Sequence, residues 1–143
     1  MSSYVVDASV VIQRLIRFTY TENARVLFSQ LADSDRLVVP EFCLLECANV
    51  LWKYVRFQGM SEATADSLVD DLIGLPITVY GSGDFLKRGL TIGLKHKLAL
   101  YDSIYIALAE QLTYPLITDD TKQAAAARAE GITPKPLTDF KPT

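Results

Sequence analysis

The chain has 143 residues, a length typical of one domain and sufficient to bury a sizeable core. Half of its residues are hydrophobic and 22% are charged, as in ordinary globular proteins. Its 14 Lys and Arg against 17 Asp and Glu leave a net charge of −3. This balance argues against a protein that coats nucleic acid through bulk positive charge, but it allows an enzyme that acts on nucleic acid with bound cations.

Two kinds of segment are missing from the sequence. No run of about 18 uncharged apolar residues occurs, so we expect no membrane span. Asp7 interrupts the first apolar segment, so we also expect no secretory signal. Cys43 and Cys47 lie one helical turn apart, and the single histidine, His96, cannot complete a zinc site with them. We interpret both cysteines as core residues of a cytoplasmic protein.

The predicted elements alternate along the chain between short apolar runs and longer segments with helical spacing. The apolar runs typical of strands cover residues 4–6, 37–39, 77–80 and 116–118, with a weaker one at 135–137. The helical segments cover residues 10–16, 21–31, 42–57, 61–72, 85–94, 101–112 and 121–130. Uniformly apolar strands that alternate with helices are typical of a parallel sheet covered on both faces. We therefore predict a single α/β domain over residues 1–143, with a central parallel sheet of four to five short strands flanked by helices.

Acidic residues follow two of the predicted strands. Asp7 comes directly after residues 4–6, and Asp119 and Asp120 come directly after residues 116–118. Parallel sheets bind ligands at the carboxyl ends of their strands, so two strands would deliver acids to the edge where sites form. Each acid also has a simpler explanation, because Asp is a preferred N-cap and a helix is predicted after both positions.

Two further acids lie within predicted helices. Glu46 has apolar neighbours on nearly every side, which predicts a buried helix in which an unpaired carboxylate would be costly. The alternative is a solvent-facing polar stripe of Glu46, Asn49 and Lys53 at helical spacing. Asp102 opens another largely apolar helix, and its alternative role is a favourable charge at the helix N-terminus.

Taken together, the acids favour a metal site. Four carboxylates that met at one edge of a sheet would repel each other unless a hard divalent cation held them, and oxygen ligands suit Mg²⁺ or Mn²⁺. Such a cation keeps bound water, which can serve as a nucleophile, and it stabilises charge on a transferring phosphate. The hydrolysis of a phosphodiester bond is the reaction that this kind of site serves best.

The ordered motifs resemble those of the PIN-domain ribonucleases, specifically the VapC-type toxins of toxin–antitoxin pairs. The resemblance is carried by four blocks, which are Val5-Val6-Asp7-Ala8-Ser9, Pro40-Glu41 with Glu46 and Asn49, Tyr101-Asp102-Ser103, and Leu116-Ile117-Thr118-Asp119-Asp120. In the last block the family has a Thr, any residue and then an Asp, which selects Thr118 and Asp120. Asp119 then occupies the variable position, and the adjacent pair leaves open which of the two reaches a metal.

The resemblance implies an endoribonuclease that depends on Mg²⁺ or Mn²⁺ and often works as a homodimer. It implies that Asp7 and Asp102 are the main metal ligands, and that Glu46 and Asp120 complete the catalytic cluster. It also implies that the polar side chains beside the acids, Ser9, Thr118 and Asn49, support the carboxylates by hydrogen bonding. RNA would be the substrate, and a small antitoxin that covers the active-site groove would be the protein partner.

Basic residues supply candidates for contact with RNA. Arg14 and Lys53 are the main ones, although each could be an ordinary solvated charge. A competing hypothesis is a PIN-like binding module without activity that docks a protein partner through its apolar helices. A phosphatase that forms a phospho-aspartate would want a second Asp where the chain has Ser9, and a phospho-receiver would want an acidic pair after the first strand. The positions of the acids argue against both of these classes of protein.

Overall fold

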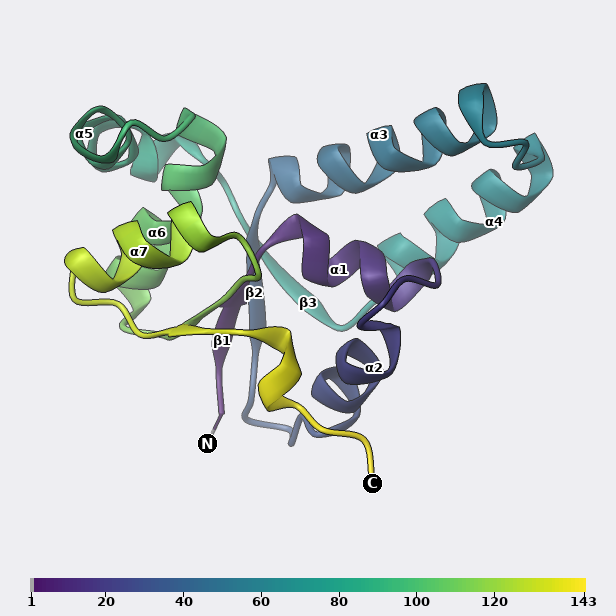
Figure 1. Ribbon diagram of the computed structural model, residues 1–143, viewed down its shortest axis with the longest axis horizontal. Coiled ribbons are helices and arrows are strands. Elements are labelled where there is room, and N and C mark those ends of the chain that lie inside the picture. The colour runs from purple at the N-terminus through teal and green to yellow at the C-terminus, as the bar shows by residue number, and fades with distance from the viewer. Residues whose placement is uncertain (1) are drawn as a thin grey trace.

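The computed structural model describes residues 2–143, and in this part of the chain five strands form one parallel sheet. The strands are β1 (Tyr4–Val6), β2 (Leu37–Pro40), β3 (Ile77–Tyr80), β4 (Leu116–Ile117) and β5 (Pro134–Lys135), in the spatial order β3-β2-β1-β4-β5 (Figure 1). The predicted fold class and central parallel sheet are confirmed. Because β1 pairs with β2 on one side and β4 on the other, the residues that follow these three strands meet near the middle of one edge.

Helices cover both faces of this sheet. The helices between residues 2 and 143 are α1 (Ala8–Leu15), α2 (Thr21–Ser29), α3 (Phe42–Phe57), α4 (Glu62–Ile73), α5 (Leu86–His96), α6 (Leu100–Leu112) and α7 (Thr121–Ala129), with 3-10 turns η1 (Gly83–Phe85) and η2 (Leu137–Asp139). Figure 1 shows α5, α6 and α7 on one side of the strands and α1 to α4 on the other. None of these helices is both long and apolar enough to cross a membrane.

The core lies where the central strands meet α6. Val5, Val6 and Val38 are completely buried, as are most other residues of β1, β2 and β4. These strands face helices on both sides, which explains why their sequences are uniformly apolar instead of alternating. Residues 103–109 of α6 are all buried as well. The first turn of α6, which carries Asp102, is therefore attached to the most rigid part of the molecule.

Helix α3 corrects the prediction that its apolar sequence makes it a buried helix. Cys43, Cys47 and Leu51 are its only buried residues within the described chain. Leu45 and Trp52 are 72% and 57% exposed. The physical reason is that α3 packs against α1 and α4 along one side and extends away from the sheet beside α4 (Figure 1). Its outer side therefore presents apolar residues that the monomer does not cover.

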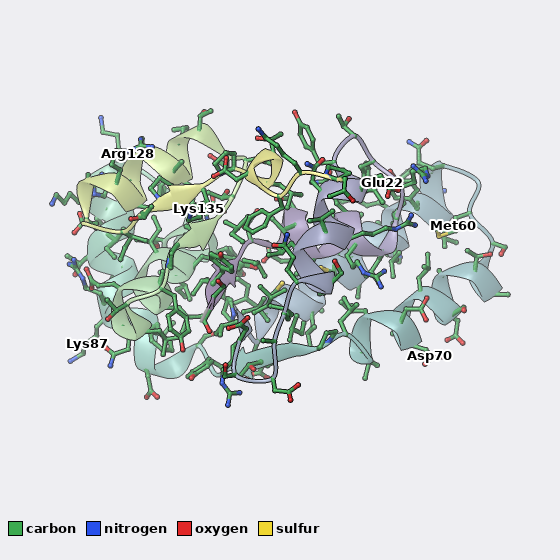
Figure 2. All side chains as sticks on the ribbon, turned by 90° about the horizontal axis from the view of Figure 1, so that it is seen from below. Glu22, Met60, Asp70, Lys87, Arg128 and Lys135 are labelled. Carbon is green, nitrogen blue, oxygen red and sulfur yellow. The ribbon has the colours of Figure 1, made fainter. Side chains whose placement is uncertain are left out.

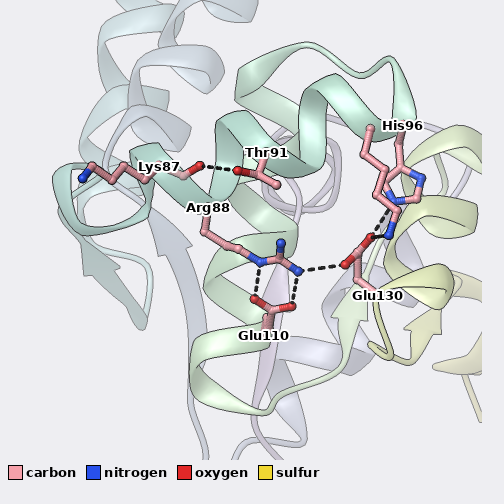
Figure 3. A network of polar contacts seen from close by, with 7 residues as sticks. Lys87, Arg88, Thr91, His96, Glu110 and Glu130 are labelled. Atoms are coloured by element: carbon pink, nitrogen blue, oxygen red, sulfur yellow. Dashed lines mark hydrogen bonds and ion pairs between the residues drawn. The ribbon is translucent and has the colours of Figure 1, made fainter.

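A polar network on the other side of the sheet fastens α5 to the chain after α7 and to α6 (Figure 3). Arg88 of α5 forms a bidentate pair with Glu110 of α6, at 2.7 and 2.9 Å, and reaches Glu130 at 2.8 Å. Lys95 and His96 contact the other oxygen of Glu130 at 3.1 and 2.7 Å. The contact with His96, followed by those with Lys95 and Arg88, lowers the pKa of Glu130 from 4.5 to about 2. The Glu130 side chain is 7% exposed, and its carboxylate joins the helices as an anion shared by several basic side chains.

We predict that Glu130→Gln destabilises the fold by about 2 kcal/mol, because Arg88 and Lys95 lose their negatively charged partner and keep only a neutral amide. The folded-state pKa of Glu130 lies below its unfolded value. Its stabilisation is therefore fully present above about pH 4.5 and is lost as the pH falls through about 2. Urea denaturation of both proteins across this pH range measures the difference.

The matched control is Glu22→Gln, which breaks the exposed pairs that Glu22 makes with Arg17 and Arg25. This change should cost less than about 0.5 kcal/mol. Equal effects of the Glu130 and Glu22 substitutions would contradict the role given to the network.

Candidate active site

The structure brings acidic side chains from separate helices to the carboxyl edge of the central strands. Asp7 directly follows β1 and Asp120 lies two residues beyond Thr118, which follows β4. Glu46 lies in the second turn of α3, and Asp102 lies in the first turn of α6. Asp7, Glu46 and Asp102 line one cavity of about 420 Å³, together with Lys53. Residues far apart in the sequence thus share one hollow at the edge where parallel sheets bind ligands.

Asp7 is held in place by the start of α1. It is the N-cap of this helix, and its Oδ2 accepts hydrogen bonds from the Ser9 hydroxyl at 2.8 Å and the Ser9 amide at 3.3 Å. The capping role and the place in the cavity are therefore compatible, because the cap uses Oδ2 while Oδ1 keeps its bonding capacity. Ser9 orients the carboxylate that we expected it to support.

Glu46 is oriented by a residue of another helix. The Tyr105 hydroxyl donates a hydrogen bond to Glu46 Oε1 at 2.9 Å. Tyr105 is completely buried and lies on α6, one turn after Asp102. Its ring also packs edge-on against Phe42, at 5.6 Å between centroids. Helix α6 therefore carries one acid of the cluster and positions a second one.

Burial and mutual repulsion raise the pKa values of three of these acids. Burial is the largest cause for Asp7, whose pKa the charge of Asp120 raises further. The pKa of Glu46 is raised by burial and then by the charges of Asp7 and Asp102. The pKa of Asp102 is raised by burial and then by Asp7 and Asp120. The four carboxylates thus form one electrostatic unit in which each added negative charge disfavours the others.

Gln123 connects the ends of α6 and α7 behind this cluster. Its side chain is 1% exposed, accepts a hydrogen bond from the Thr118 hydroxyl at 2.6 Å and donates one to the Asp102 carbonyl at 3.0 Å. Its backbone amide donates to Asp120 Oδ1 at 2.9 Å. Thr118 Oγ1 in turn accepts from the Asp120 amide at 3.1 Å. Through its side chain and its backbone amide, Gln123 therefore connects the start of α6 at Asp102 with Asp120.

The two adjacent acids after β4 have different surroundings. Asp120 caps α7, and its charge acts on Asp7 and Asp102. Asp119 Oδ1 accepts a hydrogen bond from the Leu137 amide at 3.1 Å, so this side chain fastens the segment after β5. The geometry favours Asp120 as the member of the cluster and gives Asp119 a structural partner.

Only some of the other residues predicted to support the acids or contact RNA lie at the acidic cavity. Lys53 and Asn49 line the acidic cavity, although Asn49 is exposed. Thr118 bonds Gln123 and the Asp120 amide instead of a carboxylate oxygen. Arg14 does not reach the cavity, because its guanidinium lies over the Phe28 ring at 5.8 Å and it lines a separate hollow beside α4.

Sequence reasoning missed two cations on the other side of Asp120. Arg128 and Lys135 line a hollow of about 230 Å³ together with Asp119 and Asp120. Figure 2 shows both basic residues at the α7 and β5 side of the molecule. Arg128 follows Asp120 by two helical turns on α7, but Lys135 gave no signal in the sequence, because only the pairing of β4 with β5 brings it to this hollow. Gln123 and the Glu46 contact of Tyr105 were missed for the same reason, since both depend on contacts between helices.

The donor set suits a hard divalent cation. Asp7, Glu46 and Asp120 each use one named oxygen in the hydrogen bonds above, which leaves the second oxygen for a ligand. No Lys or Arg in the described chain forms an ion pair with any acid of the cluster. Between residues 2 and 143 no three His, Cys, Asp or Glu side chains are gathered tightly enough to hold a metal ion. The chemistry of the donors fits Mg²⁺ or Mn²⁺, and the carboxylates would have to close on the ion.

The fold and the acidic cavity define an α/β domain with a carboxylate cluster at the carboxyl edge of a parallel sheet. The model of the PIN domain family matches residues 4–129. The chain belongs to the PIN-domain family, which confirms the resemblance seen in its motifs.

Two relatives align with this chain over most of its sequence. The chain is 30% identical over 122 residues to Ribonuclease VapC3 of Pyrobaculum aerophilum, covering 84% of this chain and 91% of the relative. It is 32% identical over 126 residues to Ribonuclease VapC1 of Mycobacterium tuberculosis, covering 88% of this chain and 92% of the relative. Both alignments span nearly the whole length of each protein.

Solved structures with low sequence identity share the fold. The crystal structure of PAE2754 from Pyrobaculum aerophilum matches with a TM-score of 0.72 and 20% identity, covering 96% of this chain and 85% of that one. VapBC2 from Rickettsia felis, bound to a DNA fragment from its promoter, matches with a TM-score of 0.68 and 12% identity, covering 94% and 98%. These matches show that the arrangement of strands and helices is that of known PIN-domain structures.

We predict that Gln123→Leu destabilises the fold by about 1–3 kcal/mol, because the Thr118 hydroxyl and the Asp102 carbonyl lose buried partners. Urea denaturation measures the loss. Gln111→Leu is the matched control, since Gln111 is exposed on α6 and its substitution should change stability by less than about 0.5 kcal/mol. A Gln123→Leu protein as stable as the wild type would contradict the bridging role of this side chain.

Proposed function

We propose that this protein is an endoribonuclease that depends on Mg²⁺ or Mn²⁺ and acts as the toxin of a VapBC-type pair. The observation that carries the proposal is the convergence of Asp7, Glu46 and Asp102 on one cavity, with the charge of Asp120 acting on it. Membership of the PIN-domain family and relatives named as ribonucleases support this activity.

In this proposal Asp7 and Asp102 are the main metal ligands, and Glu46 and Asp120 complete the cluster. Bound Mg²⁺ or Mn²⁺ would supply an activated water and stabilise charge on the phosphate under attack. Ser9 and Tyr105 hold Asp7 and Glu46 through their hydroxyl groups, so these carboxylates lose little freedom when they bind. Gln123 connects the Asp102 carbonyl with Asp120.

Cations around the cluster would bind the RNA backbone. Lys53 lines the acidic cavity, and Arg128 and Lys135 line the hollow beside Asp120. Together they place positive charge on both sides of the carboxylates, where phosphates that flank the cleaved bond would pass. Arg14 is the weaker candidate, because its guanidinium lies over Phe28 outside the cavity.

The proposed partners are a small antitoxin and a second copy of the chain, in the cytoplasm. Structural neighbours include toxin–antitoxin complexes, among them one from Klebsiella pneumoniae. Exposed apolar residues support a protein partner, since a groove of about 700 Å³ between α3 and α4 is lined by Leu45, Ala48 and Ile73. The same groove supports the rival proposal of an inactive binding module, which catalytic measurements distinguish.

We predict that Asp102→Asn lowers the rate of RNA cleavage at least about 100-fold, because the metal site loses a ligand and with it several kcal/mol of transition-state stabilisation. Cleavage of a panel of defined RNAs with Mg²⁺ or Mn²⁺ measures this loss. The matched control is Asp66→Asn, an exposed substitution on α4 at a residue that does not line the cavity, which should cleave at the wild-type rate. Wild-type cleavage by Asp102→Asn would rule out the proposed metal site, and no cleavage by any form would favour the binding module.

The same variant should also be stabilised less by metal than the wild type is. The folded-state pKa of Asp102 is raised, so ionised Asp102 disfavours the metal-free fold as the pH rises through this pKa. At neutral pH and without metal, Asp102→Asn should therefore melt above the wild type. Mn²⁺ at about 100 times its Kd should then stabilise the wild type by about 2.7 kcal/mol and the variant much less. If Mn²⁺ raised the melting temperatures of the wild type and of Asp102→Asn equally, the result would contradict the proposal.

A further inference from the structure

A pair of aromatic rings lies beside the acidic cavity, on the loop between α1 and α2. Phe18 and Tyr20 are 37% and 36% exposed. Phe18 lines the cavity that holds Asp7 and Asp102. Both rings line a second hollow of about 340 Å³, which shares Ser9 and Ile12 with the first one. The aromatic hollow therefore adjoins the acidic cavity along a shared wall.

The loop that carries these rings is fastened by buried polar side chains. The Thr21 hydroxyl accepts a hydrogen bond from the Phe18 amide at 2.7 Å and donates one to the Ile16 carbonyl at 3.2 Å. Gln13 Oε1 accepts one from the Tyr20 amide at 3.0 Å. Thr21 and Gln13 are 2% and 8% exposed. The backbone is thus fixed by the core, while the rings are left at the surface.

The Phe18 ring stays partly exposed although it packs on another aromatic ring. Its ring meets Tyr54 of α3 edge to face, with centroids 6.1 Å apart and an angle of 83° between the planes. This contact fixes the ring without covering it by a parallel neighbour. A large apolar side chain that is held rigid but left partly exposed gains from a flat partner that removes it from water.

We propose that Phe18 and Tyr20 form a stacking subsite for an unpaired base next to the cleaved bond. The proposal rests on the proposed function, because it is the carboxylate cluster that places a phosphate within one nucleotide of the rings. Unpaired bases bind proteins by stacking on aromatic side chains, whereas bases in duplex RNA stay stacked inside the helix. Lys53, on the wall shared with Phe18, would hold the adjoining phosphate.

The test uses a single-stranded RNA whose cleavage site has been mapped with the wild type. Phe18→Leu keeps an apolar side chain but removes the aromatic face, and it should lower kcat/KM about tenfold, mainly by raising KM. Phe18→Trp keeps a stacking face and should retain activity. Replacing the stacked nucleotide by an abasic one should slow the wild type by a similar factor and should not slow Phe18→Leu further. The same RNA annealed to its complement should be a poor substrate for every form.

Phe57→Leu is the matched control, since Phe57 is an exposed ring at the far end of α3 that packs on Trp52 and lines neither hollow. It should cleave the RNA at the wild-type rate. An unchanged kcat/KM in Phe18→Leu would overturn the proposed subsite. So would an abasic substitution in the RNA that slows the wild type and Phe18→Leu by the same factor.

Binding separates this inference from the catalytic proposal. Fluorescence anisotropy of the same labelled RNA, with the Asp102→Asn protein as the uncleaving background, should show about tenfold weaker binding when Phe18→Leu is added. If the wild type cleaves no RNA but binding still depends on Phe18, the catalytic proposal fails and the stacking subsite stands. If the wild type cleaves and Phe18→Leu changes neither binding nor rate, the subsite alone is wrong.

Discussion

The repulsion among carboxylates at one edge of a parallel sheet is the constraint on which the rest of this structure depends. The strand order places β1 between β2 and β4, and the helices that follow these strands turn their first residues toward the same edge. Burial raises the pKa values of Asp7 and Asp102, the charge of Asp120 raises them further, and no basic side chain in the described chain pairs with these acids. Such a cluster disfavours the metal-free fold, and the stability that it costs must come from elsewhere in the domain.

Helix α6 supplies much of that stability. Its buried face packs on β1 and β2, and its outer end is tied to Arg88 of α5 through Glu110. From this rigid base, Tyr105 orients Glu46, and the Asp102 carbonyl accepts a hydrogen bond from Gln123. The acids are therefore positioned by neutral hydrogen bonds from the core instead of by ion pairs. This arrangement leaves their negative charge available for a cation.

Local patterns in the sequence predicted most of the fold and the identity of the acids. The bounds of β1, β3 and α3 match the prediction residue for residue, because each of these segments has a clear apolar period and a clear start or end. The prediction was wrong about the burial of α3. An apolar sequence shows what a helix could bury, but Leu45 and Trp52 are covered only if another element or another chain packs there.

Residues whose role depends on contacts between distant segments could not be predicted. Gln123 lies in an alanine-rich helix, where nothing in its neighbourhood indicates that its amide reaches Asp102. Lys135 approaches Asp120 only through the pairing of β4 with β5. The sequence around Phe18 likewise did not predict a stacking role, because this role depends on the cavity that Phe18 lines. The roles of the acids themselves stay predictions until they are measured.

An NMR titration of the side-chain carboxyl carbons of Asp7, Glu46 and Asp102, with and without Mg²⁺, tests the proposed cation site most directly. Without metal, we expect pKa values above the usual range for all three groups. With saturating Mg²⁺, these pKa values should fall below that range, because a bound cation favours the ionised carboxylates. Titration curves that Mg²⁺ leaves unchanged would contradict the account, since the cluster would then not be a cation site.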